Sequence, residues 1–368
     1  MDGVSIDAGS LATVPPATEP PAGPLAERPL AERPPGVRQI IGRSLDLALA
    51  SSGEIRRASL YVGLLTLALA GPAVVLFLAF ARQQGGLEEA VESFSSRFGV
   101  PTRSGVLAPL GVSALFASLG LFGVIVEAQI IVTAILGGAA TGRRMAVREA
   151  LRLSRLVFWR VLGAAILVGI LSLIVSVATT ALLHPTSVTA SERSEIWQLA
   201  AQAIATTPFA FFLTGIVIGG VGPIESLRRS VRIARARWRL AILVASAGAV
   251  IAFVQAFALG AGLDLLVRVG TAAGLGLSGS VPAFVLTGFL VLAAVVAIGS
   301  LVVTVNALIV APQVVVFIGM TGYSAGLDRA SPAMDPSRYN PRPRLVTWPM
   351  IILIVLAWLA ALAGLMTV

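Results

Sequence analysis

Residues 149–183 read EALRLSRLVFWRVLGAAILVGILSLIVSVATTALL, an arginine-rich start followed directly by the uncharged stretch 161–183. A helix of about 20 apolar residues crosses the hydrocarbon core of a bilayer. The stretch 161–183 therefore predicts a transmembrane helix, and the arginines before it predict a helix end at a membrane surface. The opening EALRLS returns at residues 225–230 as ESLRRS, again shortly before an apolar stretch. The chain uses the same basic element twice.

The composition of the whole chain indicates a membrane protein. Of the 368 residues, 57% are hydrophobic and 12% are charged, and the mean hydropathy is +0.91. A soluble domain carries about a quarter charged residues, so the composition excludes a soluble fold. The absence of cysteine excludes disulfides and thiolate metal sites. All 27 basic residues are arginine, which excludes a Walker-type phosphate loop and a lysine Schiff base.

Uncharged windows mark the expected membrane crossings. Only helices and closed barrels satisfy the backbone inside a bilayer, and barrel strands would alternate in polarity. The continuous windows therefore predict helices. They cover residues 58–81, 104–142 (apolar except for Glu127), 161–183, roughly 199–222, 240–263, 269–327 and 345–368. We predict an all-α integral membrane protein of about seven transmembrane helices, with a six-helix core of repeated hairpins and a C-terminal span.

The positions of the arginines set the expected orientation. If the window 269–327 crosses the bilayer once, all but five of the 27 arginines lie on the side of the N-terminus. Splitting that window into two spans would move the arginines of residues 328–344 to the other side and weaken this asymmetry. Because positive residues gather on the cytoplasmic side, we expect a cytoplasmic N-terminus, an external C-terminus and a location in the cell membrane.

Composition also divides the chain into four parts. Residues 1–36 are rich in proline and lack aromatic residues, which predicts a disordered cytoplasmic tail. Residues 37–327 are expected to form the six-span membrane domain with its repeated units. Residues 328–344 are expected to form a basic cytoplasmic linker, and residues 345–368 the seventh transmembrane helix.

Each copy of the repeated element predicts an amphipathic helix. At helical spacing the arginines of a copy share one face, and apolar residues share another. A helix with these two faces and a tryptophan at its end lies in the membrane interface. A weaker third copy at residues 42–47 precedes the first span, so we expect interfacial helices before spans one, three and five. The arginines are Arg148, Arg152 and Arg155 in the first copy and Arg228, Arg232 and Arg235 in the second.

Two interpretations of these arginines stay open. They fix the topology alone, or they also bind anionic lipid headgroups or another membrane protein. Anionic lipid attracts each nearby arginine by about 1 kcal/mol before salt screening. Membrane lipids are therefore the expected partners, with another membrane protein as a further candidate. Nucleic acid is not expected, because the basic residues lie at the ends of the apolar windows.

The arrangement resembles the membrane domain attached to some bacterial glycerophosphoryl diester phosphodiesterases and its stand-alone polytopic membrane relatives. The resemblance covers roughly residues 36–328. It rests on the paired Ala-Leu-Arg-x-Ser-like elements and on Tyr323 with Gly326-Leu327-Asp328 after the sixth span. It implies a helical membrane domain of about six spans with no assigned activity of its own. The diesterase chemistry of that family needs histidines in a separate soluble barrel, and this chain has a single histidine, His184.

Glu127 is the most conspicuous polar residue within the windows. An ionisable group at membrane depth is costly and marks a functional candidate. We expect Glu127 to pair with Asn306 in the bundle interior, because both lie midway along the two overlong windows. The alternative is a hydrogen-bonded packing residue or a carboxylate at headgroup level near the cytoplasmic side.

The sequence predicts a protein that is not an enzyme. No nucleophile–base pair, metal-ligand cluster or cofactor motif in a suitable context is present, so catalytic residues, metals and cofactors are not expected. We expect a membrane-organising scaffold or a partner subunit that contacts anionic lipid or another membrane protein. The alternative is a transporter or permease for a small or lipid-like substrate that uses Glu127. A cavity lined by Glu127 and Asn306 would favour transport, whereas a solidly packed bundle would favour a scaffold.

Overall fold

The computed structural model describes most of the membrane domain and the C-terminal helix. The described residues are 36–84, 107–141, 144–183, 201, 203–251, 253–254, 281–321 and 345–366. Over these residues the chain is helical and contains no strand. The expected tail, apart from Gly36, and the expected linker 328–344 lie outside them.

Five helices are long and apolar enough to cross a membrane, so the chain is a multi-pass membrane protein. They are α2 (Ser52–Gln84), α4 (Leu107–Ala140), α5 (Val147–Leu183), α10 (Val281–Thr321) and α12 (Trp348–Leu365). Helix α10 continues on both sides of Pro312, so the described part of the window 269–327 is one segment.

The other two expected spans are shorter than predicted within the described residues. The window 199–222 holds the apolar stretch Ala203–Val217, which is interrupted by the 3-10 turn η2 (Thr207–Phe209) before α7 (Phe212–Val217). The window 240–263 holds the helix Trp238–Ile251. Both fall short of the roughly 20 residues that a straight helix needs. Over the described part of the chain, length and hydropathy therefore show five spans, not seven.

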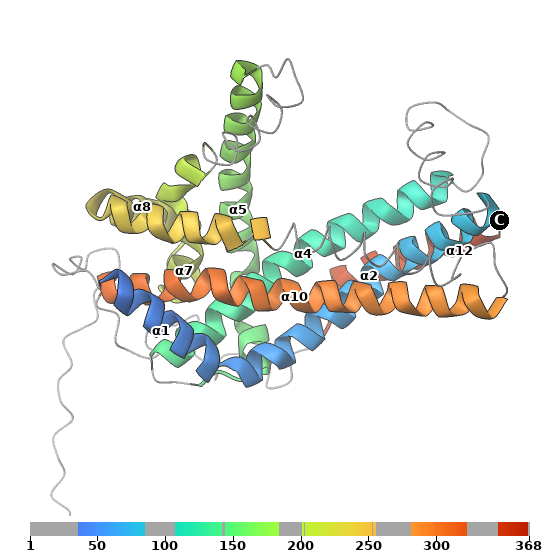
Figure 1. Ribbon diagram of the computed structural model, residues 1–368, viewed down its shortest axis with the longest axis horizontal. Helices are drawn as coiled ribbons and strands as arrows, with labels where there is room; N and C mark the ends of the chain where they lie inside the picture. Colours follow the sequence, from blue (N-terminus) through green and yellow to red (C-terminus); the bar gives the residue numbers. More distant parts are fainter. Residues whose placement is uncertain are drawn as a thin grey trace, which may run out of the picture.

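Four long helices form a bundle, and the fifth crosses it. Figure 1 shows α2, α4, α10 and α12 running along the long axis of the molecule, and contacts join α2 to the other three. Helix α5 crosses these helices steeply, and its C-terminal half leaves the bundle (Figure 1). The core lies where α2, α4 and α10 meet the start of α5, around Leu69, Ile131, Val157 and Val314.

Helices α2 and α10 cross closely. A Cβ atom on Gly63 would lie 2.5 Å from Ser300 Oγ and 2.7 Å from the carbonyl oxygen of Val296. Ser300 Oγ donates a hydrogen bond to the carbonyl oxygen of Ser59, at 3.1 Å. Small residues let membrane helices approach closely, because packing rather than the hydrophobic effect holds them together in lipid.

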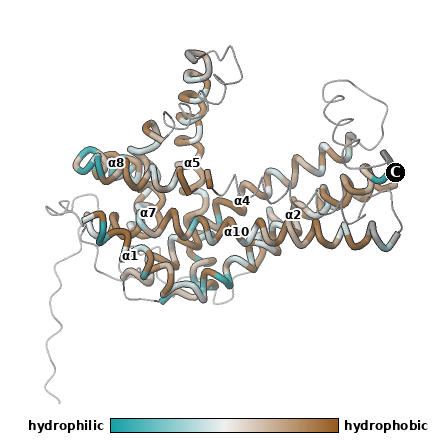
Figure 2. Tube along the Cα trace, viewed as in Figure 1, coloured by the Kyte–Doolittle hydropathy of each residue, from teal (hydrophilic) through white to brown (hydrophobic). Residues whose placement is uncertain are grey.

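The C-terminal half of α5 is apolar and exposed. Its exposed side chains include Ile166, Ile170, Leu173 and Val177. In Figure 2 this half is mainly brown, whereas hydrophilic residues gather on α8 and around α1. A protein surface of this kind is suited to contact with lipid chains rather than with water.

Two of the three expected amphipathic helices are separate elements. Helix α1 (Val37–Ala50) packs on α10 through Ile40, Ser44 and Leu47, and α8 (Pro223–Ala236) packs on α7 and η2. The expected separate helix before the third span is wrong, because α5 runs unbroken from the first arginine-rich copy into the span. Helix α8 instead ends at Ala236, because the next residue, Arg237, has a φ of −141° and a ψ of 55°, which are not helical.

Candidate functional site

The carboxylate of Glu127 lies where α2, α4 and α5 meet. Its residue is 6% exposed, and Ser154 Oγ of α5 lies 3.4 Å from Glu127 Oε1, a long hydrogen bond. Tyr61 of α2 and Arg155 of α5 also interact electrostatically with Glu127. A buried carboxylate is tolerated when cations and hydroxyl donors surround it. Glu127 therefore joins three helices at one polar point.

The structure does not pair Glu127 with Asn306, the partner expected from the sequence. Asn306 of α10 is half-buried, and no hydrogen bond of the described residues joins it to Glu127. The expectation compared only the positions of the two residues along their windows. The rotation of α4 decides the contact instead, and it turns Glu127 toward Ser154 and Tyr61.

The three arginines of the first repeated copy have different surroundings. Arg148 is exposed, whereas Arg152 and Arg155 are half-buried. Arg155 was expected to bind lipid or a partner together with Arg148 and Arg152, and in the structure its guanidinium interacts with Tyr61 and Glu127. Arg155 follows Ser154 directly, and this places it at the edge of the face that α5 buries.

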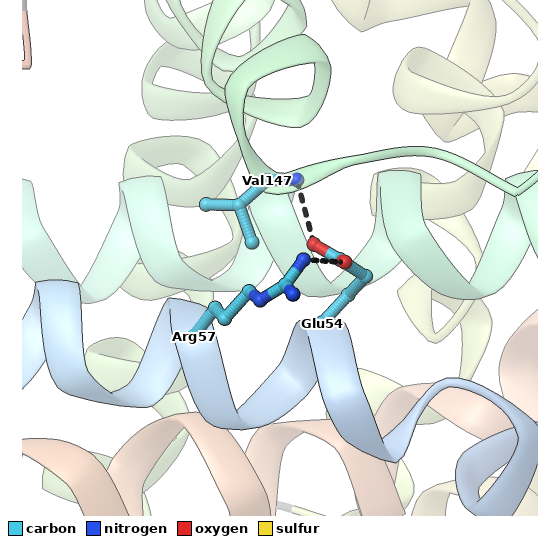
Figure 3. Close-up of polar contacts among 3 residues, drawn as sticks. All are labelled: Glu54, Arg57 and Val147. Atoms are coloured by element: carbon cyan, nitrogen blue, oxygen red, sulfur yellow. Dashed lines mark hydrogen bonds and ion pairs between the residues drawn. The ribbon is translucent and has the colours of Figure 1, made fainter.

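A carboxylate of α2 fixes the start of α5 (Figure 3). Glu54 Oε2 accepts a hydrogen bond from the backbone N–H of Val147 at 3.1 Å, and Glu54 Oε1 accepts one from Arg57. Val147 is the first residue of α5. The first N–H groups of a helix lack partners within the helix, and a negative charge there is favourable. Glu54 thus caps α5 from the neighbouring helix.

The second repeated copy keeps its three predicted arginines together. A groove of about 520 Å³ runs along α8, between the arginine stripe and an apolar wall. Both kinds of side chain line the same hollow, although the amphipathic pattern places them on different faces of the helix, so the hollow lies along the boundary between the two faces. The lining residues are Arg228, Arg232 and Arg235 with Phe209, Ile224, Leu227 and Val231.

Serines hold α8 against the broken stretch before it. Ser230 Oγ donates to the carbonyl oxygen of Pro208 at 2.8 Å and accepts from the N–H of Phe211 at 3.0 Å. Ser226 Oγ donates to the carbonyl oxygen of Phe212 at 2.5 Å. A break in a membrane helix frees backbone groups that lipid does not satisfy. The two serines supply the missing partners.

The two copies of the repeat begin and end alike in three dimensions. Glu149 and Glu225 both lie in the first turn of their helices, where the helix dipole favours a carboxylate. The closing serines, Ser154 and Ser230, are both fully buried and both hydrogen-bond toward the apolar segment that precedes their helix.

Several residues of the site were not expected from the sequence. Glu54, Arg57 and Tyr61 lie in or beside the first window, but nothing in their spacing indicates contact with residues 127–155. Arg229 is 1% exposed, although it lies within the arginine-rich stretch. Its position between Ser226 and Ser230 was the available signal, since residues three and four apart share a helix face.

No family model, no curated protein and no solved structure matches the chain. The resemblance to the membrane domain of glycerophosphoryl diester phosphodiesterases stays a prediction. Function is therefore inferred from the geometry of the arginine-rich end of the molecule.

Proposed function

We propose that the chain is a non-enzymatic membrane protein whose arginine-rich end binds anionic lipid headgroups, as a membrane-organising scaffold or a partner subunit. The observation that carries this proposal is the groove on α8. Arg228, Arg232 and Arg235 line it together with apolar side chains, so one hollow offers both positive charge and a hydrophobic wall.

This combination matches the chemistry of an anionic phospholipid. Guanidinium groups bind phosphate oxygens through paired, charge-assisted hydrogen bonds. The apolar wall, which includes Leu227 and Val231, suits the start of an acyl chain. Trp238 at the following helix is 59% exposed, and tryptophan is enriched at headgroup level in membrane proteins.

The position of α8 supports a cytoplasmic location for this groove. Figure 1 places α8 and α1 at the same end of the molecule, away from the C-terminus. Because positive residues gather on the cytoplasmic side, we propose that the two shorter apolar stretches complete a seven-crossing topology with an external C-terminus.

The decisive experiment removes the charge of the groove. In the variant R228Q/R232Q/R235Q, acidic phospholipid that co-purifies from native membranes should fall, as measured by quantitative lipid mass spectrometry. The control variant R38Q/R56Q/R144Q removes the same charge from exposed arginines outside the groove. Equal lipid content in parent, variant and control would leave topology as the sole role of the α8 arginines.

A second candidate function rests on the buried carboxylate. Glu127 lies inside the bundle beside Arg155, and ionisable groups at membrane depth often belong to substrate or proton pathways. A transporter or permease for a small or lipid-like substrate would use Glu127 as its coupling group. The resemblance to the diesterase membrane domain favours the scaffold, because it implies a membrane domain without an activity of its own.

A further inference from the structure

A second hollow lies between the N-terminal parts of α2 and α5, apart from the groove on α8. Its volume is about 310 Å³. Residues from three distant parts of the sequence line it, which means that the packing of the helices creates it. The lining includes Glu54, Arg57, Tyr61, Arg148, Leu151 and Leu345.

The charged groups of this hollow leave it positive. Among the described residues Glu54 is its one lining carboxylate, and both carboxylate oxygens are engaged, one by Arg57 and the other by the backbone N–H of Val147. Arg148 adds a second guanidinium to the lining. With two arginines and one carboxylate, the lining carries one surplus positive charge.

Tyr61 forms the inner wall of the hollow. Its hydroxyl donates a hydrogen bond to the carbonyl oxygen of Leu345 at 2.7 Å, so the ring is held between α2 and the start of the C-terminal helix. Tyr61 also interacts electrostatically with Glu127 and Arg155. Glu127 itself does not line the hollow.

The start of α5 adds to the attraction for an anion. Val147 opens the helix, and the positive end of the helix dipole lies at its first turn. Glu149 in the same turn opposes this effect, but it does not line the hollow. Leu151 and Leu345 contribute apolar surface beside the charges, as at a membrane interface.

We infer that this hollow binds one phosphate group, that of an anionic phospholipid headgroup or of a free phosphate. Arginine forks match phosphate oxygens, and the single surplus charge matches a phosphodiester, which carries one negative charge. The site is independent of the α8 groove, because the two hollows share no lining residue. Arg148 is its principal ligand-binding residue, since Arg57 is already shared with Glu54.

The test measures binding of a soluble short-chain phosphatidylglycerol to the purified full-length protein by calorimetry. All variants carry R228Q/R232Q/R235Q, so the α8 groove no longer contributes. Arg148→Gln should weaken binding about tenfold, the loss expected for one charge-assisted contact. Arg148→Lys keeps the charge and should retain most of the affinity. Arg56→Gln is the matched control, because Arg56 is exposed on α2 but does not line the hollow.

Competition with inorganic phosphate identifies the source of the ligand group. Displacement of the lipid at millimolar phosphate assigns the site to the phosphate group itself. Loss of lipid binding in Arg148→Gln without displacement by phosphate assigns it to a lipid headgroup. Parent-like binding by Arg148→Gln, or an equal loss in Arg56→Gln, overturns the inference. The α8 triple variant is first compared with the parent. This comparison shows whether the α8 groove binds lipid, independently of the result for Arg148.

Discussion

The closing serine of the repeated element has the same task in both copies. An arginine-rich helix is drawn toward headgroups and water, and a buried hydroxyl ties it to the apolar bundle. Ser154 donates to the carbonyl oxygen of Leu151 within its own helix at 2.9 Å, and its contact with the bundle is the one to Glu127 of α4 at 3.4 Å. Ser230 bonds to both Pro208 and Phe211. At the residue scale, each copy combines exposed arginines with one buried hydroxyl; the exposed arginines are Arg148 in the first copy and Arg228, Arg232 and Arg235 in the second.

Replacing Ser230 tests this anchoring role. In Ser230→Ala the N–H of Phe211 and the carbonyl of Pro208 lose their partner in a buried setting. The protein should lose about 1–3 kcal/mol of stability, the usual cost of an unsatisfied buried polar group. Thermal unfolding of the purified protein measures the change. Ser118→Ala is the control, because Ser118 is exposed and bonds only within its own helix; an equal effect there would contradict the anchoring role.

Replacing Glu127 tests its electrostatic interaction with Arg155. Glu127→Gln leaves Arg155 without its counter-charge, and should cost about 1–3 kcal/mol, less than for a fully buried pair because Arg155 is half-buried. The double variant Glu127→Gln/Arg155→Gln removes both charges and should recover part of the loss. A double-mutant cycle by thermal unfolding gives the coupling. Additive losses would mean that the two side chains act independently.

The single variant Glu127→Gln also distinguishes the scaffold from the transporter. A coupling carboxylate must change its protonation state, which glutamine does not do, although glutamine keeps the size and most of the hydrogen-bonding capacity. If Glu127→Gln supports growth as the parent does, the transporter alternative is excluded. Loss of growth rescue with normal accumulation of the protein would favour transport over a scaffold.

At the scale of elements, the apolar windows predicted the positions of the long helices well, but they did not predict where a helix is interrupted. The five long helices fall on expected windows, because an uncharged stretch of this length satisfies its backbone in lipid only as a helix. The interruption at Thr207–Phe209 was missed, although Pro208 was visible, because serines of α8 satisfy the freed backbone from a later segment. The continuity of α5 was also missed. The side chains change from charged to apolar along this helix, but such a change does not interrupt the helical backbone.

The crossing of α2 and α10 is an element-scale prediction. In Gly63→Ala the new Cβ would meet the Val296 carbonyl oxygen at 2.7 Å, and this backbone atom gives way only if the helices separate. We expect a loss of about 1–3 kcal/mol, as for overpacked cores. Gly111→Ala in α4 is the control, because nothing lies within 4 Å of the Cβ atom that alanine would add there. Unfolding in denaturing detergent, followed by circular dichroism, measures the stability of both variants. A Gly63→Ala variant as stable as Gly111→Ala would contradict the tight crossing.

At the scale of the whole molecule, the sequence located the site but not its contacts. Glu127 was visible as a charge inside an apolar window, and the α8 arginines were visible through their spacing. The partners of Glu127 were not visible, because they come from helices whose rotation only packing determines. Tyr61 lies far along the chain from both Glu127 and Ser154, and no pattern within its own helix links it to either.

Two single cysteines decide how often the chain crosses the membrane. The chain has no cysteine of its own, so each introduced thiol is the only one labelled. With seven crossings, the exposed Ala236 at the end of α8 is cytoplasmic; with five, the stretch from 203 to 254 stays outside and Ala236 is external. Both topologies leave Met366, 90% exposed near the C-terminus, on the outer side.

We therefore expect a membrane-impermeant maleimide to label Met366→Cys in intact cells and Ala236→Cys only after the membrane is permeabilised. The physical reason is the positive-inside rule, since five crossings would place the arginines of α8 on the outer side. Labelling of both thiols in intact cells would establish five crossings and move the α8 groove to the external leaflet. Protection of Met366→Cys would contradict both topologies, because each ends outside.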